Sequence, residues 1–275
     1  MSADIDNNIV YVNTKAENNY SLFKLDLNQK AVSRILSFSQ LGINPTYFLV
    51  EKNKVYVTGK RGNSGTFYLN DLEKNQWVSI ANNISEGRIE PGFTNDTYHI
   101  VSFDDNYVTR TIVDVKLKSI KERKTIKHDI PFGNNIFVPS PHGLFVYVLH
   151  QLNNNFVPYV FNLKQSTYTK FEPVVTENGL LYSAAVSNNG KNLFANVNRE
   201  IFHYQLQGDK LIQLPKIKLK IPESRNIAVS SDNLTLYVTH DVGSAISVVK
   251  FNSNYTDYTV NNINVGLPSN QVYIF

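Results

Sequence analysis

The chain has 275 residues, enough for one large all-β domain or two small ones, and its 42% hydrophobic content argues against intrinsic disorder. It has no cysteine, which excludes disulfides, thiolate catalysis and cysteine-ligated zinc. A formal net charge of +4 falls far short of the dense positive field of a dedicated nucleic-acid binder.

The N-terminal residues lack the basic segment and apolar core of a signal peptide. No stretch approaches the ~18 apolar residues that span a bilayer. These features predict a soluble protein with no membrane span and favour a cytoplasmic location.

A short apolar core recurs along the chain, with an aromatic or β-branched residue at its centre. The six central residues lie 45, 45, 46, 47 and 43 positions apart, and they are Tyr11, Tyr56, Val101, Tyr147, Phe194 and Tyr237. A period near 45 residues is typical of blades that each contain four strands.

Each repeat can be divided into four strands, a to d from the inside outward. Turn signals rich in Asn, Asp and Gly precede most of the cores, as at Asn188-Asn189-Gly190, and these residues tolerate the positive φ of a tight hairpin. An apolar run before the turn provides strand a, and the core provides strand b. Strands c and d follow, and strand d is the most polar.

The sequence therefore predicts an all-β, six-bladed β-propeller with four antiparallel strands per blade, folded as one domain over residues 1–275. The blades are expected at about 8–39 plus 269–275, 45–81, 92–128, 135–173, 182–218 and 225–263. The first repeat begins at strand b, since Asp6-Asn7-Asn8 already reads as its turn. Residues 271–275 are predicted to pair with Ile9–Val12 as its inner strand and so to close the ring.

The segments Val55-Tyr56-Val57-Thr58 and Leu236-Tyr237-Val238-Thr239 resemble the YVTN-type repeat of lactonase-like and surface-protein propellers. All six repeats share the spacing of this repeat type, and two or three of them also share its residues. The resemblance implies the propeller fold and is compatible with a hydrolytic function.

Motifs that carry chemistry are scarce. Gly62-Asn63-Ser64-Gly65 lacks the spacing of a nucleophile elbow and is interpreted as a loop. Asp104-Asp105 could hold a cation, but adjacent loop carboxylates are usually solvated. The basic runs Lys116–His128 and Lys216–Lys220 fall on outer d strands, where lysines guard against edge-to-edge association.

Propeller topology places the d–a and b–c loops on one face, and charged or polar residues near strand a or after strand b should approach the central channel. These candidate channel-mouth residues can bind an anion or perform acid–base chemistry. They are Arg88, Glu90, Asn135, His150, Glu177, Arg225, His240 and Asp241.

Two functions remain open. The first is a non-enzymatic protein-interaction scaffold, with no catalytic residues, no metal and no cofactor, whose partner is another protein rather than nucleic acid. The alternative is a lactonase-like hydrolytic propeller that binds a small molecule in a polar pocket at the channel mouth.

Deleting residues 271–275 should lower the free energy of unfolding by several kcal/mol. The loss combines about four or five backbone hydrogen bonds at ~1 kcal/mol each with apolar burial of ~1.5–3 kcal/mol per large side chain. Thermal unfolding of the truncated and full-length chains measures it, and an unchanged Tm would refute closure by this segment.

Overall fold

The structure is a computed structural model, and it divides the chain into two compact units, Met1–Lys127 and His128–Ile274. It describes residues 2–4, 9–16, 19–26, 29, 31–38, 44–51, 53–61, 64–92, 94, 96–176, 179–197, 199–208, 210–221, 224–230, 232–240 and 245–264.

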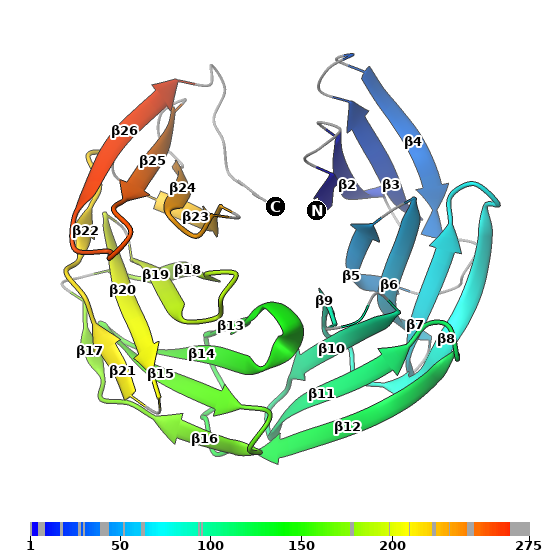
Figure 1. Cartoon of the computed structure of the whole chain (residues 1–275), viewed down its shortest axis with the longest axis horizontal. Coiled ribbons are helices and arrows are strands. Elements are labelled where there is room, and N and C mark those ends of the chain that lie inside the picture. The colour runs from blue at the N-terminus through cyan, green and yellow to red at the C-terminus, as the bar shows by residue number, and fades with distance from the viewer. Residues whose placement is uncertain are drawn as a thin grey trace. The chain divides into compact units, whose positions relative to one another are not determined.

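Over these residues the regular structure is β-strand, apart from the 3₁₀ turn η2 (Pro141–Gly143). The strands form six antiparallel sheets in the described part of the chain, and within each sheet the first four strands lie side by side in chain order (Figure 1). The prediction of an all-β chain built from four-stranded antiparallel sheets is confirmed. The described residues include no helix long and apolar enough to cross a membrane.

The first unit contains three sheets of four strands. Their strands are β1 (Ser2–Asp4), β2 (Ile9–Ala16), β3 (Asn19–Asp26) and β4 (Ala31–Ser37); β5 (Asn44–Glu51), β6 (Lys54–Arg61), β7 (Ser64–Asp71) and β8 (Gln76–Ile84); and β9 (Arg88–Pro91), β10 (Thr97–Phe103), β11 (Tyr107–Asp114) and β12 (Ser119–Lys127).

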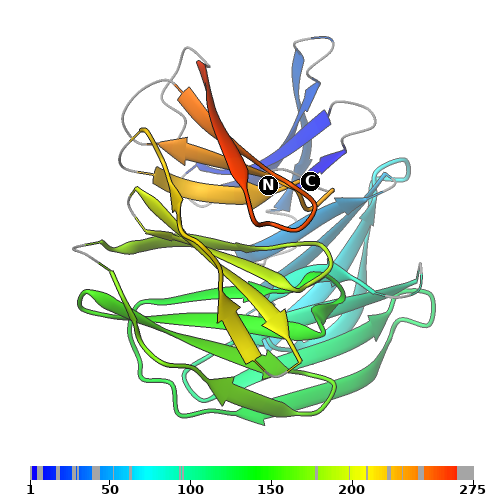
Figure 2. The same cartoon turned by 60° about the vertical axis from the view of Figure 1, so that its left-hand side comes forward.

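The second unit contains two sheets of five strands and one of four, coloured green to orange-red in Figure 2. Their strands are β13 (Asn135–Pro139), β14 (Phe145–Leu152), β15 (Asn155–Asn162), β16 (Thr167–Lys170) and β17 (Val174–Val175); β18 (Leu181–Val186), β19 (Asn192–Val197), β20 (Glu200–Gln207), β21 (Lys210–Gln213) and β22 (Ile217–Lys218); and β23 (Ser224–Val229), β24 (Thr235–His240), β25 (Ala245–Phe251) and β26 (Tyr258–Asn264).

Each hydrophobic cluster joins two sheets that are consecutive in the chain. In β19, Leu193 and Ala195 pack against Tyr147 and Phe156 of the preceding sheet. Phe194, on the opposite face of the same strand, packs against Leu236 and other residues of the following sheet. Because strand side chains alternate between faces, one strand contributes to two cores.

The predicted hairpin turns lie where positive φ is needed. At the predicted Asn188-Asn189-Gly190 turn, Gly190 has φ of 71°, and its carbonyl accepts a 2.6 Å hydrogen bond from the Tyr147 hydroxyl of the preceding sheet. A Cβ at Gly190 would lie 3.2 Å from the Ser140 Cβ. Glycine therefore serves both the turn and the close approach of two sheets.

Two of the outer strands differ from the prediction. The expected continuous strand from Leu211 to Lys218 is divided into β21 and β22, and β17 adds a fifth strand after β16. Pro215 lies between β21 and β22, and Pro173 lies between β16 and β17. Proline cannot donate a backbone hydrogen bond, so the ladder is interrupted at both positions.

The inner strand of the third sheet also differs. It was expected at Gly92-Phe93 but lies at Arg88–Pro91, where Ile89 pairs with Ile100. Gly92 instead belongs to the turn, and its N–H donates to the Thr97 carbonyl at 2.8 Å.

The first sheet has an inner strand of its own. β1 pairs with β2 through Ser2↔Tyr11, Ala3↔Val10 and Asp4↔Ile9. The prediction that the first repeat begins at its second strand is therefore wrong, because β1 already lies along β2. Residues 271–275 lie outside the described residues.

His203 is a core histidine in β20. Its side chain is 1% exposed, stacks on Phe194 at a ring distance of 4.4 Å, and its Nε2 lies 3.1 Å from Asn192 Oδ1. Burial lowers the pKa of His203 to about 4, because the charged imidazolium loses its hydration there.

His203→Gln should lower the free energy of unfolding relative to the wild type, and the size of this loss should depend on pH. The unfolded chain takes up a proton at His203 below pH ~6.5, whereas the folded chain takes it up only near pH 4. The stabilisation is therefore complete above pH ~6.5 and decreases by up to ~3 kcal/mol as the pH falls to 4. Thermal unfolding at pH 7.5 and pH 4.5 should show the stability advantage of the wild type shrinking in acid.

Phe194→Leu, which changes the same cluster without a titratable group, is the control and should be equally destabilising at both pH values. A gap between wild type and His203→Gln that does not change with pH would contradict the assignment.

Candidate functional site

Those predicted channel-mouth residues that the structure describes lie where the first strand of a sheet begins or where the second strand ends. In the second unit, the register pairs Asn135 at the start of β13 with His150 near the end of β14. It also pairs Ser224 at the start of β23 with His240 at the end of β24. Antiparallel pairing thus brings together residues that are about 15 positions apart in the chain.

Asn135 and His150 form a direct side-chain pair. Asn135 Oδ1 lies 2.8 Å from His150 Nδ1, and because an amide oxygen can only accept, Nδ1 carries the proton. His150 is 2% exposed, and its Nε2 is buried with no hydrogen-bond partner among the described residues. Burial, with a smaller contribution from the positive charge of Lys170, lowers the pKa of His150. The pair thus holds a neutral imidazole with an unoccupied lone pair on Nε2.

The segment before β13 lies against this imidazole. A Cβ on Gly133 would approach His150 Cε1 to 3.5 Å. The Gln151 N–H donates to the Asn134 carbonyl at 2.9 Å, and Asn135 Nδ2 lies 3.4 Å from the Pro131 carbonyl. The loop is therefore held to β14 at the residue next to His150.

His240 belongs to a separate hydrogen-bonded chain. It is fully buried, and its Nε2 lies 2.8 Å from Ser247 Oγ, which in turn lies 2.8 Å from Asn262 Oδ1. The serine hydroxyl donates to the amide oxygen, so it accepts from His240 Nε2–H. Ser247 is also fully buried, and this arrangement orders three neighbouring strands.

Sequence reasoning missed a buried polar link between the fifth and sixth sheets. Asn196 is fully buried in β19; its Nδ2 donates to Ser183 Oγ at 3.2 Å, and its Oδ1 accepts from Ser224 Oγ at 2.5 Å. The available signal is a polar residue between Ala195 and Val197 in a strand that is otherwise largely apolar. A buried amide requires partners, and both come from inner strands.

Arg225 lies on an inner strand of the second unit, with its guanidinium 4.9 Å from the centre of the Tyr182 ring. Both residues occur where the register shifts, between Ser224 and Ile227 in one strand and between Leu181 and Ser183 in the other. Such bulges redirect side chains and are common next to functional sites. The contact places a cation over an aromatic face at the start of β23.

Arg88 and Glu90 lie on β9 of the first unit, and Glu90 is opposite His99 in the register. Protein atoms surround the Glu90 carboxyl, although solvent reaches part of the side chain. Burial raises the pKa of Glu90 to about 7, and the positive charge of Arg88 offsets part of this effect. A carboxyl group with such a pKa can exchange a proton near neutral pH.

The remaining predicted positions lie in turns and strands or outside the described residues. Glu177 and Asp241 lie outside the described residues, as do Gly62 and Asn63. Ser64 Oγ donates to Asn83 Oδ1 at 2.8 Å in a β7–β8 contact. Asp104 Oδ1 accepts from the N–H groups of Asn106 and Tyr107 in a turn. The described residues contain no group of three or more His, Asp or Glu side chains placed to hold a metal ion.

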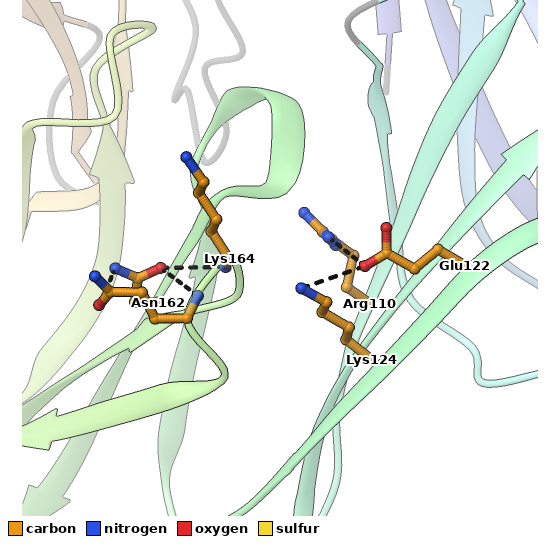
Figure 3. A network of polar contacts seen from close by, with 6 residues as sticks. Arg110, Glu122, Lys124, Asn162 and Lys164 are labelled. Carbon is orange, nitrogen blue, oxygen red and sulfur yellow. Dashed lines mark hydrogen bonds and ion pairs between the residues drawn. The ribbon is translucent and has the colours of Figure 1, made fainter.

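The densest basic run forms much of β12, the outermost strand of its sheet. There Glu122 Oε1 lies 2.9 Å from Arg110 Nη2 and 3.5 Å from Lys124 Nζ (Figure 3). In the second unit, Asn162 Oδ1 accepts from the backbone N–H of Lys164 at 3.1 Å, which closes a turn (Figure 3). Part of the positive charge of β12 is thus neutralised within the sheet.

No protein-family model and no curated protein matches the chain. Solved structures do match. A candidate 6-phosphogluconolactonase of Bacteroides fragilis is 14% identical with a TM-score of 0.58, over 95% of this chain and 83% of its own. One of Bacteroides uniformis is 13% identical with a TM-score of 0.60, over 96% and 84%. The periplasmic gluconolactonase of Pseudomonas aeruginosa is 10% identical with a TM-score of 0.58, over 98% and 85%.

These similarities show a propeller fold like that of these structures, since identities this low carry the fold alone. They also correct the functional prediction. The non-enzymatic interaction scaffold is contradicted by neighbours named as lactonases, which favour the hydrolytic alternative. The prediction rested on the lack of a linear catalytic motif, which does not exclude a site built from residues of separate strands.

Compared with the wild type, Glu90→Gln should have a higher free energy of unfolding at pH 8, and this gain should be smaller at pH 4.5. The unfolded carboxyl ionises near its ordinary pKa of 4.5, but the folded one ionises near 7, so ionisation opposes folding as the pH rises between these values. Allowing for partial solvent access, the penalty at pH 8 should be about 1–2 kcal/mol.

Chemical denaturation at both pH values measures this difference, with Glu73→Gln on an exposed turn as the control. If the difference between Glu90→Gln and wild type is the same at pH 4.5 and pH 8, the raised pKa is excluded.

Proposed function

We propose that this chain is a lactonase-like hydrolase in which His150 acts as general base and Asn135 positions it. The observation that carries the proposal is the buried imidazole whose Nδ1–H is held by Asn135 at 2.8 Å while Nε2 keeps its lone pair. The lowered pKa of His150 supports a neutral, base-competent form at physiological pH.

In the proposed reaction, His150 Nε2 takes a proton from a water molecule as the water oxygen attacks the lactone carbonyl. The imidazolium then donates that proton to the ring oxygen as the acyl C–O bond breaks. The product is an open hydroxy acid, and the neutral imidazole is restored. Asn135 keeps the ring in one tautomer, because its amide oxygen can accept only from Nδ1–H.

The proposal extends to the architecture and the remaining candidates. It comprises one six-bladed propeller with YVTN-type repeats. Ring closure by residues 271–275 stays a prediction because those residues lie outside the described part of the chain. Arg88, Glu90, Arg225, His240, Glu177 and Asp241 stay candidates for binding at the channel mouth. Among them, Arg225 over Tyr182 offers a cation, and Glu90 offers a group that titrates near neutrality.

His150→Ala should lower kcat/KM for lactone hydrolysis by about 10²–10⁴-fold, the usual contribution of a general base. The wild-type pH profile should have an acid limb whose midpoint lies below 6.5, because the pKa of His150 is lowered. Asn135→Asp should move this limb to higher pH, because a neighbouring carboxylate favours the imidazolium. Stopped-assay titration of acid release from a panel of γ- and δ-lactones measures both effects.

Lys164→Ala, in the turn after β15, is the matched control and should retain wild-type rates. A His150→Ala variant that is folded and fully active would remove the proposed base. An Asn135→Asp profile that coincides with the wild type would show that the pair does not govern the reaction.

A further inference from the structure

Lys170, the last residue of β16, lies on the same face of its sheet as His150. Lys170 is paired with Tyr159 of β15, and Tyr159 is paired with Val148 of β14. His150 follows Val148 by two positions in the same strand. Paired residues of antiparallel strands share a face, as do alternate residues of one strand, so the lysine and the imidazole project from one surface of the sheet.

The lysine side chain lies over the strand that separates it from the strand of His150. In the sheet order β13-β14-β15-β16, that strand is β15, and Lys170 Nζ lies over the Tyr159 ring, 6.0 Å from its centre. Tyr159 is 3% exposed, so it gives the ammonium a fixed aromatic surface. Burial is the main cause of the lowered pKa of His150, and the charge of Lys170 adds to it, so the field of the ammonium reaches the imidazole.

Lys170 forms no ion pair with the residues that the structure describes. The Asp129 carboxylate instead accepts a 2.8 Å hydrogen bond from the hydroxyl of Tyr168, which also belongs to β16. Lys216 provides a contrast, because it too lies over an aromatic ring but has its Nζ 3.1 Å from Glu200 Oε2. Lys170 therefore has a positive charge that no carboxylate of the described chain neutralises.

The proposed hydrolysis creates a negative charge that such a cation can stabilise. As water adds to the carbonyl carbon, the π pair of the C=O bond moves to the carbonyl oxygen, while His150 Nε2 takes the water proton. The pair then re-forms the C=O bond as the ring C–O bond breaks, and the imidazolium protonates the ring oxygen. An ammonium near both charges favours the reaction only if it lies closer to the oxyanion than to the imidazolium.

We infer that the ammonium group of Lys170 binds the carbonyl oxygen of the lactone and stabilises the oxyanion of the tetrahedral intermediate. The inference rests on the proposed hydrolytic function and adds a catalytic residue to it. Its support is the face that Lys170 shares with His150 and the position of Nζ over Tyr159. The ammonium donates a hydrogen bond and keeps its three protons throughout, so the step needs no further acid or base.

Lys170→Gln should lower kcat for δ-valerolactone, an uncharged lactone, about tenfold or more while changing KM by less than about twofold. The loss falls on kcat because the oxyanion exists only after water has added. It should be smaller than the loss of about 10²–10³-fold for an enclosed oxyanion donor, since Lys170 is exposed to solvent. Lys170→Arg, which keeps a cation, should recover most of the lost rate.

The pH profile distinguishes this role from a structural one. Removing the ammonium removes one of the causes that lower the pKa of His150, so Lys170→Gln should move the acid limb of kcat/KM to higher pH. Lys170→Arg should leave this limb near its wild-type position. Other titratable groups that lie on this face or contact it are unchanged in both variants: Tyr159, Tyr168, Asp129 and His128.

Lys210→Gln, at an exposed lysine that begins β21 of the next sheet, is the matched control and should keep the wild-type rate and pH profile. Both lysines are exposed, so all the variants should keep the wild-type Tm.

The outcomes separate the two proposals. Hydrolysis by the wild type with an unchanged or higher kcat in Lys170→Gln would overturn the oxyanion role and leave the hydrolase intact. A change confined to the KM of lactones that carry a carboxylate would do the same, because it would assign Lys170 to substrate binding alone. Absence of hydrolysis by the wild type for every lactone would overturn both.

Discussion

The packing of the chain depends on one constraint: a four-stranded sheet has two apolar faces and cannot cover either of them alone. Leu193 and Phe194 are adjacent in β19, yet they belong to different hydrophobic clusters on opposite sides of the sheet. The same arrangement holds in the first unit, where Val57 and Tyr56 of β6 face different neighbouring sheets. Repetition is the physical solution, because each added sheet buries the exposed face of the one before it.

This architecture leaves the ends of the strands as the places where polar groups can gather. Asn135 and His150 are brought to 2.8 Å because the start of an inner strand always pairs with the end of the next. Their chemistry then follows from burial. Burial lowers the pKa of His150, and the same physical effect raises that of Glu90, because in each case the charged form loses hydration. One packing scheme thus yields a neutral imidazole and a carboxyl group that titrates near neutrality.

The histidines show why burial alone does not indicate function. His203 and His240 are as buried as His150, but each has its Nε2 within hydrogen-bond distance of a side-chain oxygen, from Asn192 and Ser247 respectively. In His150 the bonded atom is Nδ1, and Nε2 is left without a partner in the described part of the chain.

The sequence by itself determined the all-β class, the period near 45 residues and most of the strand positions, because alternation and turn residues are local signals. It misplaced the inner strand near Gly92 and missed β1, since those depend on which backbone groups find partners. It also overlooked Pro173 and Pro215, whose missing N–H is a local signal for an interrupted ladder. Asn135 and His150 were both identified as candidates, but their pairing and the unpartnered Nε2 required the register.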